Sequence, residues 1–365
     1  MTRTADVTVV GGGPGGCATA IALCRMGLRV TLLDQGRPAG AGIGETLPAE
    51  AHAMLSRLGA WQWFPTGGRV RSGGTCSAWG GADLAWRDGF AQAAGAGWHV
   101  DRDVLDPALR RAAACGGADV RGGVRVVYAG RRRRGGWLLS LRDETGRSTR
   151  LATAFVVDAS GRGAVVARHF GPRHSADRLT SSYARIGGCP DAAPLRHAIV
   201  ESVPDGWWYA AGLPSGQRAV AFFSDADLVR RRRTACPGGW YALLRQTRFI
   251  FDALGRPGQP ERVRCAPAAS HCLLRVHGGD WAATGDAVTA WDPLTAAGLT
   301  TALRSGVDLA AAVRAALAGD HGALDQYAAR AHQLYTRYLI ERSSYYQIER
   351  RWPEAEFWRR RKAAN

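Results

Sequence analysis

Lysine is almost absent from this 365-residue chain: of its 48 lysine and arginine residues, only Lys362 is a lysine. The formal net charge of +17 therefore rests on arginine. We expect the runs Arg131–Arg134 and Arg230–Arg233 to lie in loops and the ending FWRRRK to be a solvated tail. No recognised nucleic-acid-binding module accompanies them. The sequence thus predicts no nucleic-acid partner, and an acidic peptide or protein is the partner that such a charge would attract.

Paired cysteines and long apolar runs are also missing. The eight cysteines are scattered without C-x-x-C or metal-finger spacing, so neither a zinc site nor a disulfide framework is expected. No window approaches the roughly 18 uninterrupted apolar residues of a membrane span. The N-terminus runs almost directly into a strand, with no signal peptide. We therefore expect a soluble, cytoplasmic, globular protein without a membrane partner and large enough for two lobes.

The first clear motif lies at the N-terminus, where VTVVGGGPGGCATAIALCRMGLRVTLLD is typical of a strand, a glycine turn, an Ala-rich helix and a second strand. In this βαβ unit Gly11 permits the tight turn, Gly13 lets the backbone approach a pyrophosphate, and Gly16 lets helix and strand pack closely. The helix N-terminus adds amide donors and positive potential. Asp34 ends the second strand, where its carboxylate can accept hydrogen bonds from both ribose hydroxyls. The unit predicts a site for NAD or FAD.

A second motif, DWAATGDAVTAWDPLTAAGLTTALRSGVDLA, has a short strand, a proline turn and a small-residue segment before a helix. It resembles the second FAD fingerprint of the glutathione-reductase-type flavoproteins. The resemblance implies that Asp286, next to Gly285, binds the ribityl or pyrophosphate part and that Pro293 lies along the isoalloxazine. It also implies that the amides of Gly298 and Leu299 face the flavin pyrimidine edge, where a helix N-terminus stabilises negative charge. The two motifs together imply one extended cofactor, FAD.

Two segments between these motifs fit the same cofactor because of their order in the chain. WHVDRDVLDPALRRAA indicates a strand followed by a helix, and FVVDASGR is an apolar strand that ends at Asp158. In flavoproteins of this type the positions matching Arg102 and Asp106 support the cofactor, and the resemblance assigns Asp158 to the same site. The order of all four motifs along the chain indicates an FAD-binding protein more specifically than any one motif does.

Residues Gly42–Pro48, GIGETLP, and Asp205–Pro214, DGWWYAAGLP, extend the resemblance to the flavin-dependent halogenase and aromatic monooxygenase superfamily. Within it the chain is most similar to the flavoprotein maturation enzymes for tryptophan-derived quinone cofactors, which hydroxylate a protein tryptophan. Residues 268–273 and the ending YYQIERRWPEAEFW carry the resemblance over nearly the whole chain. It implies a monooxygenase that hydroxylates an indole ring with FAD and O2 through a flavin C4a-hydroperoxide.

Halogenation is the main competing reaction, and this sequence lacks the lysine that it requires. In the tryptophan halogenases, hypochlorous acid formed at the flavin is relayed to an active-site lysine after the G-E-S/T-x-P motif. Here residues 65–99 contain Arg69, Arg71 and Arg87 but no lysine. An always protonated arginine does not replace an amine that must be attacked. The same FAD motifs would also suit a non-oxygenating flavin oxidase or dehydrogenase, or a scaffold that binds FAD only for stability.

Hydroxylation requires that the ring be held over the flavin and shielded from water, and aromatic walls can do both. We expect Trp207, Trp208, Tyr209 and Trp291 to line the substrate pocket. In a strand, Trp207 and Tyr209 face one side and Trp208 faces the other, so at least one of them is expected to be core packing.

Two residues are candidates for proton transfer. His271 could be a general base because its ordinary pKa lies near neutrality, although a lone histidine is more often structural. Glu45 could position the isoalloxazine or relay a proton, and capping of a helix expected over residues 47–58 is equally compatible with its position. No metal site is predicted.

These motifs predict an α/β fold with a glutathione-reductase-type Rossmann FAD-binding domain made of residues 1–64, 99–168 and 262–318. Residues 65–98 and 169–261 form a β-sheet substrate-binding domain, with RHAIVES, GWWYAAGLP and QRAVAFFSD as strands. Residues 319–365 form a short C-terminal helical segment. The apolar positions of this segment, which are at helical spacing and indicate packing, are Leu324, Tyr327, Ala331, Leu334, Tyr335, Tyr338 and Leu339.

The substrate and the reductant follow from what surrounds the FAD motifs. The chain ends sooner after its last long helix than the tryptophan halogenases do, which suggests a more open pocket. With the basic charge, this favours a tryptophan on a peptide or a partner protein, of acidic character. The sequence has no second dinucleotide βαβ unit, so we expect NAD(P)H to reduce the flavin directly or a separate flavin reductase to do so.

Overall fold

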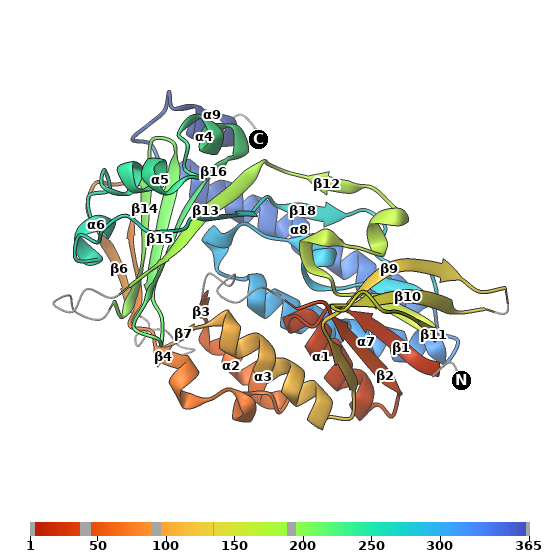
Figure 1. The fold of residues 1–365 in the computed structure, drawn as a ribbon. Coiled ribbons are helices and arrows are strands. Elements are labelled where there is room, and N and C mark those ends of the chain that lie inside the picture. The colour runs from red at the N-terminus through yellow and green to blue at the C-terminus, as the bar shows by residue number, and fades with distance from the viewer. Residues whose placement is uncertain (1–3, 37–44, 89–95, 134, 188–194, 363–365) are drawn as a thin grey trace.

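The structure is a computed structural model that describes residues 4–36, 45–88, 96–133, 135–187 and 195–362. Figure 1 shows two lobes, each built around a large sheet, and a long helix near the C-terminus that runs from one lobe to the other. No helix among these residues is long and apolar enough to cross a membrane. This α/β architecture confirms the predicted fold class.

The first lobe is built on one sheet, with the strands β1 (Thr4–Val10), β2 (Val30–Asp34), β8 (Asp119–Gly122), β9 (Val124–Arg131), β10 (Trp137–Asp143), β11 (Ser148–Asp158) and β19 (Trp281–Ala283). Their order is β8-β2-β1-β11-β10-β9, and β19 also pairs with β11. β1, β2, β8, β11 and β19 are parallel, whereas β9 and β10 are an antiparallel extension. Val7, Val9 and Leu32 have no exposed surface, as in a parallel sheet covered on both faces.

The helices of the first lobe are α1 (Pro14–Arg25), α2 (Ala49–Arg57), α3 (Arg102–Cys115) and α7 (Gly298–Leu317). The N-terminus of α3 is capped by Asp101, whose side chain accepts a hydrogen bond from the Asp103 amide at 2.9 Å. Short 3-10 turns lie at Trp61–Trp63, Thr66–Gly68, Gly161–Gly163 and Ala167–His169.

The second lobe is a mostly antiparallel sheet of order β17-β13-β16-β15-β14-β5-β6. The predicted strands appear as β14 (His197–Val203), β15 (Gly206–Gly212) and β16 (Arg218–Asp225), which are neighbours in the sheet. The other strands are β5 (Gly74–Ala78), β6 (Ala85–Asp88), β13 (Leu179–Ile186) and β17 (Arg264–Pro267), and helices α4 (Ala226–Arg231), α5 (Pro237–Leu244) and α6 (Ile250–Ala253) accompany the sheet.

Two small sheets join the lobes. The first contains β3 (Glu45–Leu47), β7 (Trp98–Val100) and β4 (Arg69–Arg71); the second contains β12 (Arg173–Ser175), β18 (His271–Leu273) and β20 (Thr289–Ala290). The second sheet pairs a strand from each side of the predicted boundaries at 169 and 262. Moreover β17 belongs to the second lobe, although it lies after residue 262. The chain therefore crosses between the lobes through paired strands.

The C-terminal segment forms α8 (Gly322–Ile348) and α9 (Glu356–Lys362), as the helical prediction required. The prediction of a solvated tail was wrong. Phe357 and Trp358 in α9 have exposures of 0 % and 1 %, and they pack with Trp207 and Tyr346 against the second-lobe sheet. Arg361 is also buried, and it pairs with Asp225 at 2.8 Å. The tail packs on the protein because the apolar Phe357 and Trp358 precede its run of arginines.

The other two arginine runs, which were predicted to be loops, lie partly in a strand and a helix. Arg131 is the last residue of β9 and pairs with Asp280 at 2.8 Å. Arg230 and Arg231 belong to the last turn of α4, where a positive charge interacts favourably with the helix dipole. The loop assignment was therefore wrong for these residues.

Candidate active site

The first glycine motif forms the turn between β1 and α1. Gly11 has a φ of 117°, which favours glycine, and a Cβ on Gly16 would lie 1.9 Å from the Gly11 carbonyl oxygen. A Cβ on Gly13 would meet no atom of the protein within 4 Å. Gly11 and Gly16 are thus required by the turn itself, whereas the face of Gly13 is open at the N-terminus of α1. That open face is where the sequence predicts a pyrophosphate.

Asp34 lies at the end of β2, as predicted. One of its carboxylate oxygens is 3.3 Å from the Gly12 amide, and the other is 3.1 Å from Arg110 of α3. The side chain keeps 14 % of its surface exposed. The pairing with Arg110, which the sequence did not indicate, holds the carboxylate beside the glycine turn; ribose binding by Asp34 stays a prediction.

The second motif lies directly beside the first. A Cβ on Gly15 in α1 would be 3.6 Å from the Gly285 Cα, and a Cβ on Gly306 in α7 would be 2.4 Å from the Gly15 carbonyl oxygen. The Thr19 hydroxyl bridges the two helices, because its one hydrogen is shared between the carbonyl oxygens of Gly15 at 2.8 Å and Gly306 at 3.1 Å. Segments far apart in sequence are therefore packed against each other, which brings the two motifs together.

Asp286 lies in the 3-10 turn Gly285–Ala287 and keeps 38 % of its side chain exposed. Arg162 approaches its carboxylate at 3.6 Å and also donates to the carbonyls of Ala269 and Trp291. Arg162 thereby ties the D-x-x-G-R segment to the second motif. The sequence contained this signal, since the arginine follows Asp158 at a fixed spacing, but Arg162 was not among the predicted site residues.

Asp158 was predicted to contact the cofactor, and its side chain does not fit that role. Its exposure is 0 %. One oxygen accepts hydrogen bonds from the amide and the hydroxyl of Ser160, and the other accepts from the amides of Val166 and Ala167 at 2.7 Å. The carboxylate closes the turn after β11 and has no surface to offer a ligand.

Arg102 and Asp106 form a pair one turn apart at the start of α3, with Nε and Oδ1 2.8 Å apart. Each side chain keeps 12 % of its surface exposed. The structure therefore brings them together and leaves part of both on the surface of the first lobe; support of a cofactor by Arg102 stays a prediction.

The proline turn and the helix after it form the third side of the site. Pro293–Thr295 is a 3-10 turn that is capped by Asp292, whose Oδ1 accepts from the Leu294 amide at 3.0 Å. Gly298 begins α7, and a Cβ there would meet no atom within 4 Å. The Leu299 side chain is buried at 6 % exposure, so only its backbone amide could face a ligand. The open N-terminus of this 20-residue helix suits negative charge.

His271 is buried, with 3 % of its surface exposed, in β18. Burial first, and then the positive charges of Arg173 and Arg162, lower its pKa to about 4. The imidazole is therefore neutral near pH 7. Its Nε2 lies 3.0 Å from the Asp286 carbonyl oxygen, which can only accept, so Nε2 carries the hydrogen and Nδ1 is the basic atom.

Glu45 is the first residue of β3, opposite Val100 of β7, and its side chain lies outside the described part of the structure. The predicted helix over residues 47–58 is α2, which begins at Ala49 with Pro48 as its N-cap residue. Residues 42–44 of the GIGETLP motif lie outside the described residues. The next residue, Thr46, is described: its hydroxyl is 2.9 Å from the Tyr209 hydroxyl and 3.0 Å from His99 Nδ1.

The prediction that Trp207 and Trp208 line the pocket was wrong for both side chains. Trp208 has 0 % exposure and packs with Phe222 and Trp240 on one face of the second-lobe sheet. Trp207 has 1 % exposure, stacks on Phe223 at 4.0 Å and faces the opposite side. The alternation of a strand separates the two rings, as predicted, but both faces of this sheet are covered by helices.

Tyr209 and Trp291 are less buried than Trp207 and Trp208. Tyr209 is half-buried, and its hydroxyl contacts Thr46 across the boundary between the lobes. Trp291 is half-buried and stacks on Tyr338 of α8 with ring centroids 4.6 Å apart. Both rings lie near the predicted flavin segments, and substrate contact by either one stays a prediction.

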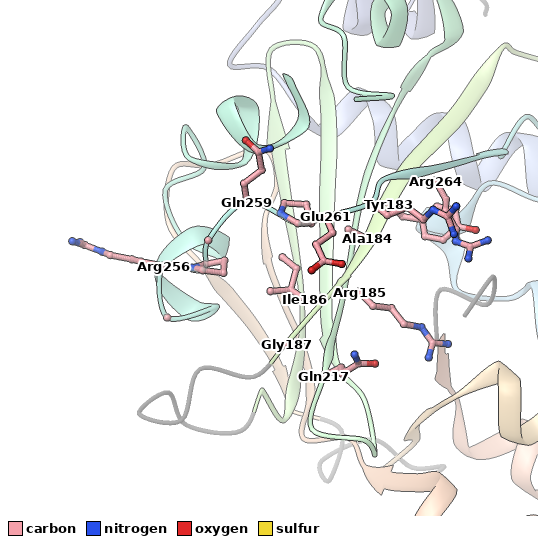
Figure 2. A pocket seen from close by; sticks show the side chains of 15 residues that line it. Tyr183, Ala184, Arg185, Ile186, Gly187, Gln217, Arg256, Gln259, Glu261 and Arg264 are labelled. Atoms are coloured by element: carbon pink, nitrogen blue, oxygen red, sulfur yellow. The ribbon is translucent and has the colours of Figure 1, made fainter. Parts of the chain in front are cut away.

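A cavity of about 790 Å³ opens beside β13 in the second lobe. Figure 2 shows the Tyr183, Arg185 and Arg264 side chains pointing toward the first lobe, and Arg256 pointing away from the cavity. Arg185 pairs with Asp101 at 2.8 Å, which places this part of the wall next to the N-terminus of α3. Four arginines and one carboxylate are among the lining residues.

Comparison with known proteins decides the family. The family model described as FAD binding domain matches residues 4–342. The chain belongs to this FAD-binding family. LodB of Marinomonas mediterranea, which carries the name of an FAD-dependent oxidoreductase, is 28 % identical over 367 residues, or 98 % of this chain and 97 % of that protein. A tryptophan 2-halogenase of Chondromyces crocatus is 26 % identical over 374 residues, or 98 % of this chain and 70 % of that protein.

Solved structures of other flavoproteins share the fold. The myxobacterial chondrochloren halogenase CndH matches with a TM-score of 0.89 at 22 % identity, over 99 % of this chain and 86 % of that one. QhpG, a peptidyl tryptophan dihydroxylase, matches with a TM-score of 0.81 at 24 % identity, over 99 % of this chain and 79 % of that one. The predicted superfamily is confirmed, and the FAD-binding chain is a flavin-dependent oxidoreductase.

The residues of the site fit FAD. The two glycine faces at Gly13 and Gly298 are open, so the backbone can be approached closely at both helix N-termini. Gly285 lies next to Gly15, and the adjacent Asp286 keeps 38 % of its side chain exposed. These residues would hold the pyrophosphate, ribityl and ring parts of FAD.

Proposed function

We propose that this flavoprotein hydroxylates the indole ring of a tryptophan that is carried by a peptide or a partner protein. The observation that carries the proposal is the position of the only lysine. Lys362 is the last residue of α9 (Figure 1), and residues 65–99, which follow the G-E-T-L-P motif, contain no lysine. The lysine that receives hypochlorous acid in the tryptophan halogenases therefore has no counterpart in that segment.

The chain itself supplies binding, orientation and charge. Bound FAD, once reduced, supplies the activation of O2 for transfer of oxygen to the ring. The turn at Pro293 and the N-terminus of α7 would hold the ring system and stabilise negative charge at its edge. Nδ1 of the neutral His271 can accept a proton, because Nε2–H is held by the Asp286 carbonyl.

The cavity beside β13 supports a substrate larger than a free amino acid. A volume of about 790 Å³ is in the upper part of the range of roughly 300–1,000 Å³ for ligand pockets, and a single indole needs only a fraction of it. Its arginines suit acidic residues next to the target tryptophan. The similarity to QhpG, which is a peptidyl tryptophan dihydroxylase, points in the same direction.

The reductant in this proposal is NAD(P)H, which acts either directly or through a separate flavin reductase. The described residues contain one dinucleotide βαβ unit, at β1-α1-β2, and Asp34 at its end suits the ribose of FAD. A nicotinamide cofactor would therefore visit the flavin transiently.

Halogenation of an indole or a phenol is the second candidate, because a tryptophan 2-halogenase is 26 % identical over 98 % of this chain. The two functions differ in the atom that is added to the ring. A flavin oxidase or dehydrogenase differs from both, since its substrate reduces the flavin without O2.

The decisive experiment is co-expression with each tryptophan-containing peptide or protein encoded beside the gene, followed by mass spectrometry of that peptide. We expect a gain of one or two oxygen atoms on tryptophan. A Lys362→Arg variant, which has no lysine, is expected to give the same product. Replacement of hydrogen by chlorine or bromine would overturn hydroxylation, as would flavin reduction by the peptide under anaerobic conditions.

A further inference from the structure

Asp292 is a buried carboxylate whose hydrogen bonds join the flavin-facing turn to α8. The residue is 1 % exposed. Its Oδ1 accepts from the Leu294 amide at 3.0 Å and so caps the turn Pro293–Thr295. Its Oδ2 accepts from the Tyr346 hydroxyl at 2.7 Å and from Arg342 Nε at 3.2 Å. The orientation of the cap therefore depends on two residues about 50 positions later in the chain.

The partners of Asp292 lie on one face of α8 at intervals of four residues: Tyr338, Arg342 and Tyr346. All three are buried, with exposures of 1 %, 8 % and 1 %. The Tyr338 hydroxyl accepts from the backbone amide of Asp292 at 2.7 Å. One face of this helix thus holds both the backbone and the carboxylate of the residue that begins the turn.

The same residues connect the turn to the rest of the active site. Arg342 also pairs with Asp177 at 2.9 Å, and Asp177 accepts from the Ser270 amide next to His271. The Tyr346 hydroxyl accepts a hydrogen bond from Trp207 Nε1 at 3.1 Å and donates one to Asp292 Oδ2. Burial and the Asp292 carboxylate raise the pKa of Tyr346 well above its ordinary value, so it remains a donor.

We propose that Tyr346, together with Arg342, is a positioning residue for the cofactor: it holds Asp292 in the orientation that caps Pro293–Thr295 and so keeps this turn and the N-terminus of α7 ready to receive the flavin ring. This assignment applies to the flavin site whether the ring reaction is hydroxylation or halogenation. It also gives Trp207 a role behind the site, as the donor that orients Tyr346.

The test is Tyr346→Phe, which removes one hydroxyl and leaves the ring in place. Removal of a hydrogen bond to a charged group costs about tenfold in an equilibrium constant, so we expect the FAD dissociation constant to rise about tenfold. The visible absorption bands of the bound flavin should shift, because the turn along the ring is less well held. In the FAD-free protein the Leu294 amide should exchange its hydrogen several times faster.

Tyr335→Phe is the matched control. Tyr335 lies on the same helix, is also buried at 5 % exposure, and its hydroxyl has no hydrogen-bond partner among the described atoms. Its removal should change neither the FAD dissociation constant nor the flavin spectrum. Arg342→Lys, which keeps the charge but cannot span both Asp177 and Asp292, should act like Tyr346→Phe.

A purely structural role makes a different prediction. In that case Tyr346→Phe would lower the thermal unfolding midpoint but leave FAD affinity, flavin spectrum and Leu294 exchange within about twofold of those of Tyr335→Phe. That result would overturn the proposal. All of these readouts are independent of the substrate, so they stand apart from the outcome of the peptide experiment.

Discussion

At the scale of single residues, burial decides which groups can take part in chemistry. His271 and Asp158 are both polar residues next to the FAD motifs, and both are almost completely buried. Asp158 has every oxygen occupied by the turn that it closes, whereas His271 uses one nitrogen and leaves the other as a base. His271 is surrounded by Arg173 and Arg162, with Asp177 as the opposing charge.

The pKa of His271 predicts how the stability of the protein depends on pH. The imidazole has a pKa of about 4 in the folded protein and of about 6.5 in the unfolded chain. Between these values the unfolded chain binds a proton at His271 that the folded protein does not, so the contribution of His271 to stability is nearly constant above pH 6.5 and falls as the pH approaches 4. At pH 5 the loss should be about 2 kcal/mol relative to pH 7.

Urea unfolding at pH 7 and pH 5 measures this loss, with His271→Gln as the comparison because glutamine can still donate to the Asp286 carbonyl. The variant should lose about 2 kcal/mol less than the wild type over this interval. Equal losses in both proteins would contradict the low pKa. If His271 is the catalytic base, the acidic limb of the rate profile should lie near pH 4 and not near pH 6.5.

At the scale of elements, the glycines of the turn between β1 and α1 serve two different purposes. Gly16 is required by close packing within the protein, and Gly13 has free space where its side chain would be. The two residues belong to the same motif, and the motif alone does not separate these purposes.

This difference predicts opposite results for two alanine variants. Gly16→Ala puts a Cβ against the Gly11 carbonyl and should destabilise the FAD-free protein by about 3 kcal/mol. Gly13→Ala should change that stability by at most about 1 kcal/mol and instead weaken FAD binding, because the methyl group enters the space of the pyrophosphate. Urea unfolding of the FAD-free proteins and fluorescence titration with FAD measure the two effects. Loss of stability without loss of FAD affinity in Gly13→Ala would contradict the assignment.

At the scale of the whole molecule, α8 and α9 hold the lobes together. α8 begins in the core of the first lobe, where Leu324 and Tyr327 are buried, and ends against the second lobe at Tyr346. α9 then covers Trp207 and Phe223 on the second-lobe sheet. The C-terminal segment, which the sequence suggested was a short helical addition, is part of both cores.

Deletion of residues 353–365 should therefore destabilise the protein and not only shorten it. The deletion removes Phe357 and Trp358, whose exposures are 0 % and 1 %, and the loss of two buried aromatic side chains should cost at least about 5 kcal/mol. Thermal unfolding and binding of a hydrophobic dye to the newly exposed sheet measure the effect. Arg359→Gln, at an exposed position of the same helix, is the control and should behave as the wild type. An unchanged unfolding midpoint after the deletion would show that α9 does not belong to the core.

The sequence was sufficient for the cofactor and for the main elements. Glycine spacing, the acid at Asp34 and the D-P-L turn depend on local backbone geometry, which a short sequence window specifies, and the family comparison confirmed FAD. The strand alternation of Trp207 and Trp208 was predicted for the same reason. Whether either ring faced substrate could not be predicted, because that depends on α5 and α9, which cover the two faces from elsewhere in the chain.

The sequence by itself thus determined the FAD-binding fold, and its single lysine is the reason that we propose hydroxylation over halogenation. Only the tertiary structure decided which side chains are available at the site. It placed Asp158 in a closed turn, buried Trp207 and Trp208 in hydrophobic cores, and brought Tyr346 to Asp292. The physical reason is that burial and hydrogen bonding of a side chain depend on partners distant in sequence. Local patterns specify the backbone of each motif, and packing specifies which side chains remain available for function.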